Sequence, residues 1–197
     1  RTLRENPADI SHIGLQWLVR AGYLRALETN TYAWLPLGVR SLQKIQNLLQ
    51  KACEKIGAQE IHLPNAAPTE LWKETQRLQW YSSPSYCLQD SQLRYIGMTP
   101  YLEEIIHRLI RRELTSYKQL PHSLYHVSPT WHEEIPEDQI PSLGHESQIF
   151  HLFNFSSSGL EMEAQSHQNQ LAFANFFKQC DLPLKIASSF SSHLPTA

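Results

Sequence analysis

A pair of carboxylates and a group of cations near the middle of the chain are the first residues that could do chemistry. Glu103 and Glu104 open a predicted helix, and a carboxylate in a first helical turn can bind an amine or simply favour the helix dipole. Cations follow on and just after the same helix: Arg108, Arg111, Arg112 and Lys118. Arg108 and Arg112 are four residues apart and share a helix face. This basic cluster could contact an RNA backbone or an acidic partner, or it could be an ordinary solvated face.

The segment that follows Trp131 is acidic. It includes Glu133, Glu134, Glu137 and Asp138 but no arginine before residue 147. Its two histidines carry little charge at pH 7 unless their surroundings raise their pKa. No Ser/His/Asp arrangement and no glycine loop of the kind that cradles a phosphate stands out in the chain.

Two predicted strands must frame this acidic segment. Residues 123–131 read as one strand, and residues 148–155 as its antiparallel return. A helix over residues 102–116 precedes them and carries the two glutamates and the three arginines of the basic cluster. A long helix over residues 160–180 follows, with Leu171, Phe173, Phe176 and Phe177 as its large apolar side chains.

The clearest amphipathic helix lies nearer the N-terminus, over residues 39–56. Its apolar side chains recur every three or four residues, and Gly57 ends it. Pro36 and Gly38 are expected to break the chain before it begins. The remaining predicted elements are helices at 10–20 (capped by 6–9) and 68–74, strands at 31–35, 59–63 and 184–186, and a hairpin of 86–88 with 93–97. This order predicts an α+β fold, in which a mostly antiparallel sheet is flanked by helices.

The composition fits one globular domain with a short tail. The chain has 197 residues, 41% of them hydrophobic and 18% charged, and a formal net charge of -2. We expect a domain over residues 1–186 and a serine-rich tail over 187–197. The charge argues against a dominant, non-specific nucleic-acid footprint. Cys53, Cys87 and Cys180 are widely spaced, so we expect neither a metal site nor a disulfide framework.

Three blocks of the sequence resemble a known family. They are NPADISHIGLQWLVRAGYLR followed by TYAWLPLGVRSLQKI, then GAQEIHLPNAAPTELWKET, then RRELTSYKQLPHSLYHVSPTW. Together these blocks resemble the N-terminal part of the catalytic domain of bacterial-type prolyl-tRNA synthetases, which are class II aminoacyl-tRNA synthetases. The match covers most of residues 2–135, and residues 159–184 still resemble the helix and strand that follow motif 2 of the family.

The resemblance implies a fold and a dimer interface. The fold would be a truncated class II synthetase core. The long helix over residues 39–56 and the strand ending in Pro64 coincide with motif 1, which forms the dimer interface in the family. The residues implied for that interface are Val39, Leu42, Ile45, Leu49 and Pro64. The apolar stripe of the helix also fits a plain core helix.

The resemblance also implies an ATP site, from which the cationic groups are missing. The family motif runs Phe-Arg-x-Glu and then, after a loop, Arg-Gly-Arg-Glu-Phe. Aligned without a gap, residues 131–134 and 143–147 keep the glutamates and the glycine but none of the arginines. What remains of the ATP site is His132, Glu134, His145 and Glu146. ATP and Mg are therefore implied as cofactors by the resemblance alone.

The implied proline pocket departs from the family as well. A Thr-x-Glu pattern precedes the helix in the family. Here a gap-free count puts Tyr101 at the threonine position, while matching Thr99 instead inserts two residues before the glutamates. Thr99, Tyr101 and Glu103 are thus the candidate amino-acid pocket. Motif 3 and the anticodon-binding domain would lie after residue 197, and SSFSSHLPTA stands where a glycine-rich segment is expected.

Three functions follow as hypotheses. The first is a degenerate prolyl-tRNA synthetase-like protein without aminoacylation activity, acting as a homodimer or by pairing with a related synthetase-like chain. The second is a proline–tRNA ligase whose remaining catalytic parts lie outside this chain. The third is a sensor that binds proline or a similar small amine in the old pocket. We expect a cytoplasmic location, no membrane association, and at most weak contact with tRNA.

Overall fold

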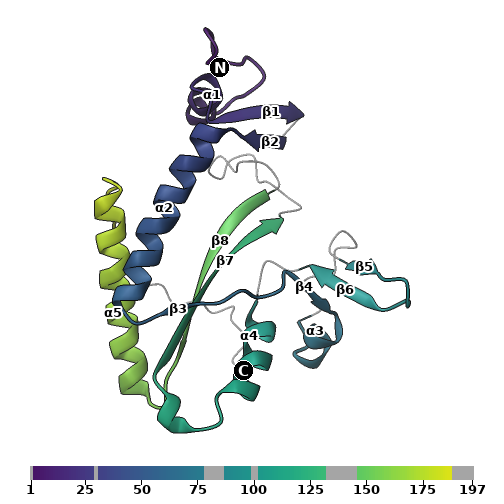
Figure 1. Ribbon diagram of the computed structural model, residues 1–197, viewed down its shortest axis with the longest axis vertical. Helices are drawn as coiled ribbons and strands as arrows, with labels where there is room; N and C mark the ends of the chain where they lie inside the picture. The colour runs from purple at the N-terminus through teal and green to yellow at the C-terminus, as the bar shows by residue number, and fades with distance from the viewer. Residues whose placement is uncertain (1, 29–30, 78–86, 99–101, 132–145, 188–197) are drawn as a thin grey trace.

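The computed structural model describes residues 2–28, 31–77, 87–98, 102–131 and 146–187, and it is an α+β arrangement built around two long strands (Figure 1). The helices are α1 (Ile13–Arg20), α2 (Pro36–Lys55), α3 (Glu70–Glu74), α4 (Glu103–Glu113) and α5 (Gly159–Gln179), with a 3-10 turn over Tyr117–Gln119. The strands are β1 (Leu24–Glu28), β2 (Thr31–Trp34), β3 (Gln59–Glu60), β4 (Ala66–Pro68), β5 (Cys87–Gln89), β6 (Tyr95–Met98), β7 (His122–Trp131) and β8 (Glu146–Phe155).

The central sheet has the order β3-β7-β8. β7 and β8 pair antiparallel over ten residues each, from His122 opposite Phe155 to Trp131 opposite Glu146. β3 adds a short parallel pairing to the other edge of β7. Two smaller antiparallel sheets, β1-β2 and β4-β6-β5, complete the strands of the described residues. The predicted fold class is therefore confirmed.

Successive side chains of β7 enter two different cores, because neighbouring residues of a strand point to opposite faces. Leu124 packs with α3, α4 and β4 residues, including Trp72 and Ile106. Tyr125 packs on the other face with Cys53 at the end of α2 and with Phe150 of β8. Figure 1 shows the same division, with α2 and α5 on one side of the sheet and α4 on the other.

The N-terminal part forms a third small core. Ile10, Leu15, Val19 and Leu24 are buried together where α1 packs on the β1–β2 pair. The backbone N–H of Leu35 donates to the carbonyl of Tyr23, which ties the start of α2 to this unit. The unit thus sits on the N-terminal end of α2, away from the β7–β8 ladder (Figure 1).

Several predicted boundaries are wrong for identifiable reasons. α1 begins at Ile13 rather than residue 10, and its cap is the imidazole of His12, which accepts from the N–H of Gly14 at 3.2 Å. Pro36 begins α2 instead of breaking the chain, since proline's fixed φ and missing donor suit a first helical position. Pro68 belongs to strand β4, so the predicted helix over 68–74 begins only at Glu70.

Two further differences concern strands. β1 and β4 were not expected from the sequence, and no strand forms over residues 184–186. The side chains of Leu184 and Ile186 are instead exposed after the end of α5. The predicted hairpin is confirmed as β5 and β6, in antiparallel register from Cys87 opposite Gly97 to Gln89 opposite Tyr95.

The close approach of α2 to Tyr23 gives a stability prediction. A Cβ at Gly38 would collide with the backbone carbonyl of Tyr23 and would lie 2.9 Å from a ring carbon of Trp34. We expect Gly38→Ala to lower the free energy of unfolding by about 1–3 kcal/mol, as overpacking does. The matched control is Gly159→Ala at the start of α5, where an added Cβ meets nothing within 4 Å. Urea unfolding measures the stability of both variants. Equal free energies of unfolding for Gly38→Ala and Gly159→Ala would contradict this account.

Candidate functional site

One face of the β7–β8 ladder gathers polar side chains that a core would ordinarily exclude. Leu124, His126, Ser128 and Thr130 of β7 alternate onto this face and are all buried. Their register partners on β8 are Phe153, His151, Ile149 and Ser147. We call these eight residues the histidine face. It lies on the same side of the sheet as the core built from α3 and α4.

His126 is the most constrained residue of the histidine face. It is 3% exposed, and its Nδ1 lies 3.0 Å from the carbonyl oxygen of Ile61. Because a carbonyl can only accept, Nδ1 must carry the proton, and a neutral ring then leaves a bare lone pair on Nε2. That Nε2 is buried and has no hydrogen-bond partner within the described part of the chain.

Aromatic contacts hold the imidazoles in place. The ring of His126 stacks on that of His151 with centroids 6.2 Å apart, and His151 stacks on Phe153 at 5.9 Å. His62, which follows β3, meets His126 edge-on at 5.9 Å. The hydroxyl of Ser128 lies 3.3 Å from Nε2 of His151. The rings are therefore fixed in orientation by both stacking and hydrogen bonding.

The environment keeps these two histidines neutral. Burial lowers the pKa of His126 and is the largest cause; the hydrogen bond with the Ile61 carbonyl opposes it, His62 lowers the pKa by a smaller amount, and Glu60 raises it least. Burial also lowers the pKa of His151, as does His126, while Glu103 acts in the opposite direction. The histidine face thus offers neutral imidazoles and hydroxyl groups at pH 7 rather than positive charge.

Glu103 and Glu104 begin α4, as predicted, and both approach Arg77 beyond the end of α3. The Glu104 side chain is 3% exposed, and one carboxylate oxygen is 3.2 Å from Arg77 and accepts from the hydroxyl of Thr75 at 3.0 Å. Glu103 is half exposed, and its carboxylate lies 4.0 Å from Arg77. The arginine thus pairs with Glu104, and its single charge leaves the pair of carboxylates with a net negative charge beside Glu103. Thr99 and Tyr101, the other predicted pocket residues, lie outside the described residues.

The basic cluster is partly engaged. The guanidinium of Arg108 bonds both carboxylate oxygens of Glu74, at 2.7 and 2.9 Å, and so links α4 to α3. Arg111 and Arg112 are exposed in the last turn of α4, where cations favour the helix dipole. Trp72 of α3 is buried in the core.

The predicted ATP-site residues are mostly beyond the described part of the chain. His132, Glu134 and His145 lie outside it, and Glu146 begins β8 opposite Trp131. The strands that would frame the site, HSLYHVSPTW and ESQIFHLFNF, contain neither lysine nor arginine. Among the described residues, no group of three or more His, Cys, Asp or Glu side chains could hold a metal ion. The described strands therefore supply no lysine or arginine to a triphosphate.

The residues predicted for a dimer interface do not form one exposed patch. Val39 and Ile45 of α2 are 37% and 47% exposed. Leu42 and Leu49 of the same helix are half-buried, and Pro64 is exposed after β3. Val39, Ile45 and Pro64 thus present apolar surface, and the dimer interface stays a prediction. None of the helices in the described ranges is long and apolar enough to cross a membrane.

His126, His151 and Ser128 were not singled out from the sequence. The signal was available in the two-residue alternation of each predicted strand, which places His126 and Ser128 on the same face as the buried Leu124. His151 required the register between the strands, because only the pairing of His126 with His151 brings the rings together.

The buried histidines predict an acid-sensitive stability. Their folded pKa values lie below the ordinary value of 6.5, so the unfolded chain takes up protons first as the pH falls below that value. The free energy of unfolding should decrease there by up to about 1.4 kcal/mol per pH unit for each histidine. His126→Asn should weaken this dependence, while the same change at the exposed His107 should not. Urea unfolding between pH 7 and 5 tests this, and a wild-type stability independent of pH would refute it.

Comparisons with known proteins agree on one family. No family model matches the chain. The chain is 34% identical over 184 residues to the proline–tRNA ligase of Moorella thermoacetica, which covers 93% of the chain and 32% of the relative. It is 40% identical over 134 residues to the ligase of Thermotoga maritima, covering 68% of the chain and 23% of that protein. The chain thus spans a third or less of the length of these curated relatives.

Solved structures match the fold. Prolyl-tRNA synthetase from Giardia lamblia, in complex with prolyl-adenylate, superposes with a TM-score of 0.70 at 16% identity, over 82% of this chain and 34% of that one. The enzyme from Cryptosporidium parvum, complexed with halofuginone and AMPPNP, gives a TM-score of 0.67 at 14% identity, over 84% and 35%. The chain is therefore prolyl-tRNA synthetase-like, with the class II synthetase fold over most of its length.

Proposed function

We propose that this chain is a prolyl-tRNA synthetase-like protein that does not aminoacylate tRNA by itself and acts instead by binding, either to a second copy or to a related chain. The observation that carries the proposal is the absence of cationic side chains around the ATP position. Strands β7 and β8 contain no lysine or arginine, and residues 132–145 between them contain none either.

The chemistry of amino-acid activation explains why this absence matters. The reaction joins a carboxylate to the α-phosphate of ATP, so both reactants are anionic and negative charge builds on phosphorus. Arginine suits this reaction because its fork binds two phosphate oxygens and keeps its charge. Each lost charge-assisted contact costs roughly 1.5–3 kcal/mol. Neutral histidines at positions 126 and 151 supply no replacement charge.

The acidic residues add to this effect. Glu137 and Asp138 stand in the segment that corresponds to the ATP-binding loop. Their charges would repel a triphosphate. In the candidate proline pocket, Arg77 already occupies Glu104 and lies near Glu103, so an incoming amine would compete with an internal cation. The acidic loop sequence and the Arg77–Glu104 ion pair both support the proposal that the chain does not activate proline by itself.

A second function is favoured by the length of the relatives. The chain is 33–42% identical to several proline–tRNA ligases yet spans only 23–32% of their length. It could therefore be one part of an ATP-dependent proline–tRNA ligase whose other catalytic parts lie outside this sequence. Activity regained on adding those parts would distinguish this alternative from a degenerate protein.

The proposed function leads to a prediction about the activation of proline. We expect no proline-dependent exchange of pyrophosphate into ATP above background, because the phosphate contacts are missing. The proline–tRNA ligase of Thermotoga maritima serves as the positive control under the same conditions. Measurable exchange by the chain alone would overturn the proposal. A thermal shift by proline without ATP would instead point to a small-amine sensor.

The proposed function also leads to a prediction about self-association through α2. We expect the wild-type chain to sediment as a dimer and Val39→Asp with Ile45→Asp to sediment as a monomer, since a buried unpaired charge opposes association. The matched control is Leu88→Asp, on the hairpin strand β5, where the side chain is similarly exposed at 57%. Analytical ultracentrifugation reads the result. A monomeric wild type, or dissociation by the control alone, would contradict the α2 interface.

A further inference from the structure

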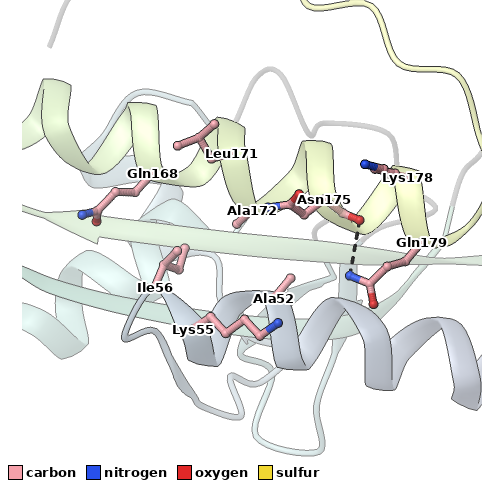
Figure 2. Close-up of a pocket in the computed structure, with 9 residues that line it drawn as sticks. All are labelled: Ala52, Lys55, Ile56, Gln168, Leu171, Ala172, Asn175, Lys178 and Gln179. Carbon is pink, nitrogen blue, oxygen red and sulfur yellow. Dashed lines mark hydrogen bonds between the residues drawn. The ribbon is translucent and has the colours of Figure 1, made fainter.

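A groove runs between α2 and α5 on the side of the sheet away from the histidine face. Its volume is about 800 Å³. The lining residues are Ala52, Lys55, Ile56, Gln168, Leu171, Ala172, Asn175, Lys178 and Gln179. Figure 2 shows Ala52 and Ile56 of α2 and Ala172 of α5 on the two facing sides. Small side chains at the contact keep the groove open, and Gln179 donates to the backbone carbonyl of Asn175 along its rim.

The charges of the groove are all of one sign. Lys55 and Lys178 lie in the last turns of their helices, and no acidic residue contributes to the lining. Neither lysine forms an ion pair with any residue in the described ranges. The nearest acid in sequence, Glu54, accepts a hydrogen bond from Gln50 within α2 and does not line the groove.

The positive charge continues along α2 beside the groove. Arg40, Lys44, Lys51 and Lys55 recur at spacings of four, seven and four residues, which places them on one stripe of the helix. All four side chains are exposed. Of these four residues, Lys55 lines the groove, and the other three extend the positive stripe along α2 towards its N-terminus.

The groove also offers apolar contact surface. Leu171 is 53% exposed on α5. Lys178 lines a second, adjoining cavity of about 500 Å³, whose other residues are Ala174, Asp181, Leu182, Pro183, Leu184 and Ile186. Leu184 and Ile186 are exposed there, and Asp181 is the acid among the residues that line this extension. The combined surface therefore interleaves exposed apolar side chains with amide groups, and Lys55 and Lys178 make its main groove positive.

The charge and the side chains of the groove distinguish among the molecules that could bind in it. A second copy packed groove to groove about a two-fold axis would bring the lysines of one copy towards the lysines of the other, so like charges would meet. A single-stranded nucleic acid would find no aromatic side chain among the lining residues on which to stack a base. An acidic helix with an apolar stripe would match both the positive charge of Lys55 and Lys178 and the exposed apolar side chain of Leu171.

We propose that the α2–α5 groove docks an acidic amphipathic helix of another protein, with its apolar stripe over Leu171 and its carboxylates beside Lys55 and Lys178. The proposal names a partner class for the binding role proposed above and rests on that role. The surface differs from the self-association surface tested through Val39, so the two can fail separately. A third helix laid on α2 and α5 would complete a local three-helix layer.

The experiment measures fluorescence anisotropy of synthetic helical peptides added to the whole chain. The probe carries leucine on one stripe and glutamate on its flanks, and its matched counterpart carries lysine in place of glutamate. We expect the acidic peptide to bind, more weakly at high salt, and the basic peptide not to bind. Lys55→Glu with Lys178→Glu should weaken acidic-peptide binding about tenfold or more. The matched control is Lys73→Glu, an exposed lysine of α3, which should bind as the wild type.

Further measurements keep the outcome unambiguous. Circular dichroism of the double variant checks that it is folded, and Leu171→Asp provides an independent disruption of the apolar floor. Sedimentation of both variants should match the wild type, which separates this groove from the α2 self-association surface. The proposal is overturned by absence of acidic-peptide binding, by equal binding of the basic peptide, or by binding unaffected in both groove variants. Tighter binding of a single-stranded RNA, lost in the double variant, would overturn it in favour of a nucleic-acid surface.

Discussion

The antiparallel ladder between β7 and β8 is the interaction on which the rest of the structure depends. Its ten paired residues form the wall between two cores, and the pleat of β7 sends Leu124 to one and Tyr125 to the other. A slip of one residue would exchange these sides and place His126 among the apolar residues under α2. The hydrogen bond from His126 to the carbonyl of Ile61 adds a second constraint, because it fixes where the chain after β3 lies.

The two faces of the ladder have different chemistry. On the α2 side, burial and the nearby Glu60 raise the pKa of Tyr125 to about 12, so its hydroxyl remains a proton donor and bonds the carboxylate of Glu60 at 3.3 Å. On the other side, the histidine face offers neutral imidazoles and hydroxyl groups. Both faces of the ladder are thus packed without a lysine or arginine from β7 or β8.

The long elements were predictable from sequence and the short ones were not. Residues 123–131 and 148–155 alternate clearly, and residues 39–56 keep a helical period, so β7, β8 and α2 were found. β1 contains Leu24, Ala26 and Leu27, which suit a helix as well as a strand, and only its pairing with β2 decides the matter. Leu184 and Ile186 alternate with polar residues, yet no neighbouring strand pairs with them in the described structure. Strand formation there depends on a partner that local sequence does not encode.

The candidate site was predictable only in part for a similar reason. Glu103 and Glu104 were located at the start of α4, but the ion pair between Glu104 and Arg77 is a contact between separate parts of the chain. Likewise the pairing of His126 with His151 depends on register rather than on either strand alone. Sequence reasoning therefore identified which groups were present and which were missing. It could not say which of the remaining groups neutralise one another.

The connectivity of the central sheet has a consequence for how this protein is made. Gln46 of α2 hydrogen-bonds Gln148 of β8, which lies 102 residues later in the chain. The carbonyl of Ile61 likewise bonds His126, which lies 65 residues later. A ribosome releases the chain from its N-terminus at about 5–20 residues per second. Helix α2 therefore emerges several seconds before the strands and helix that cover its apolar side. During that interval a chaperone, or a second nascent chain on the same messenger RNA, has access to the side of α2 that is covered in the folded protein.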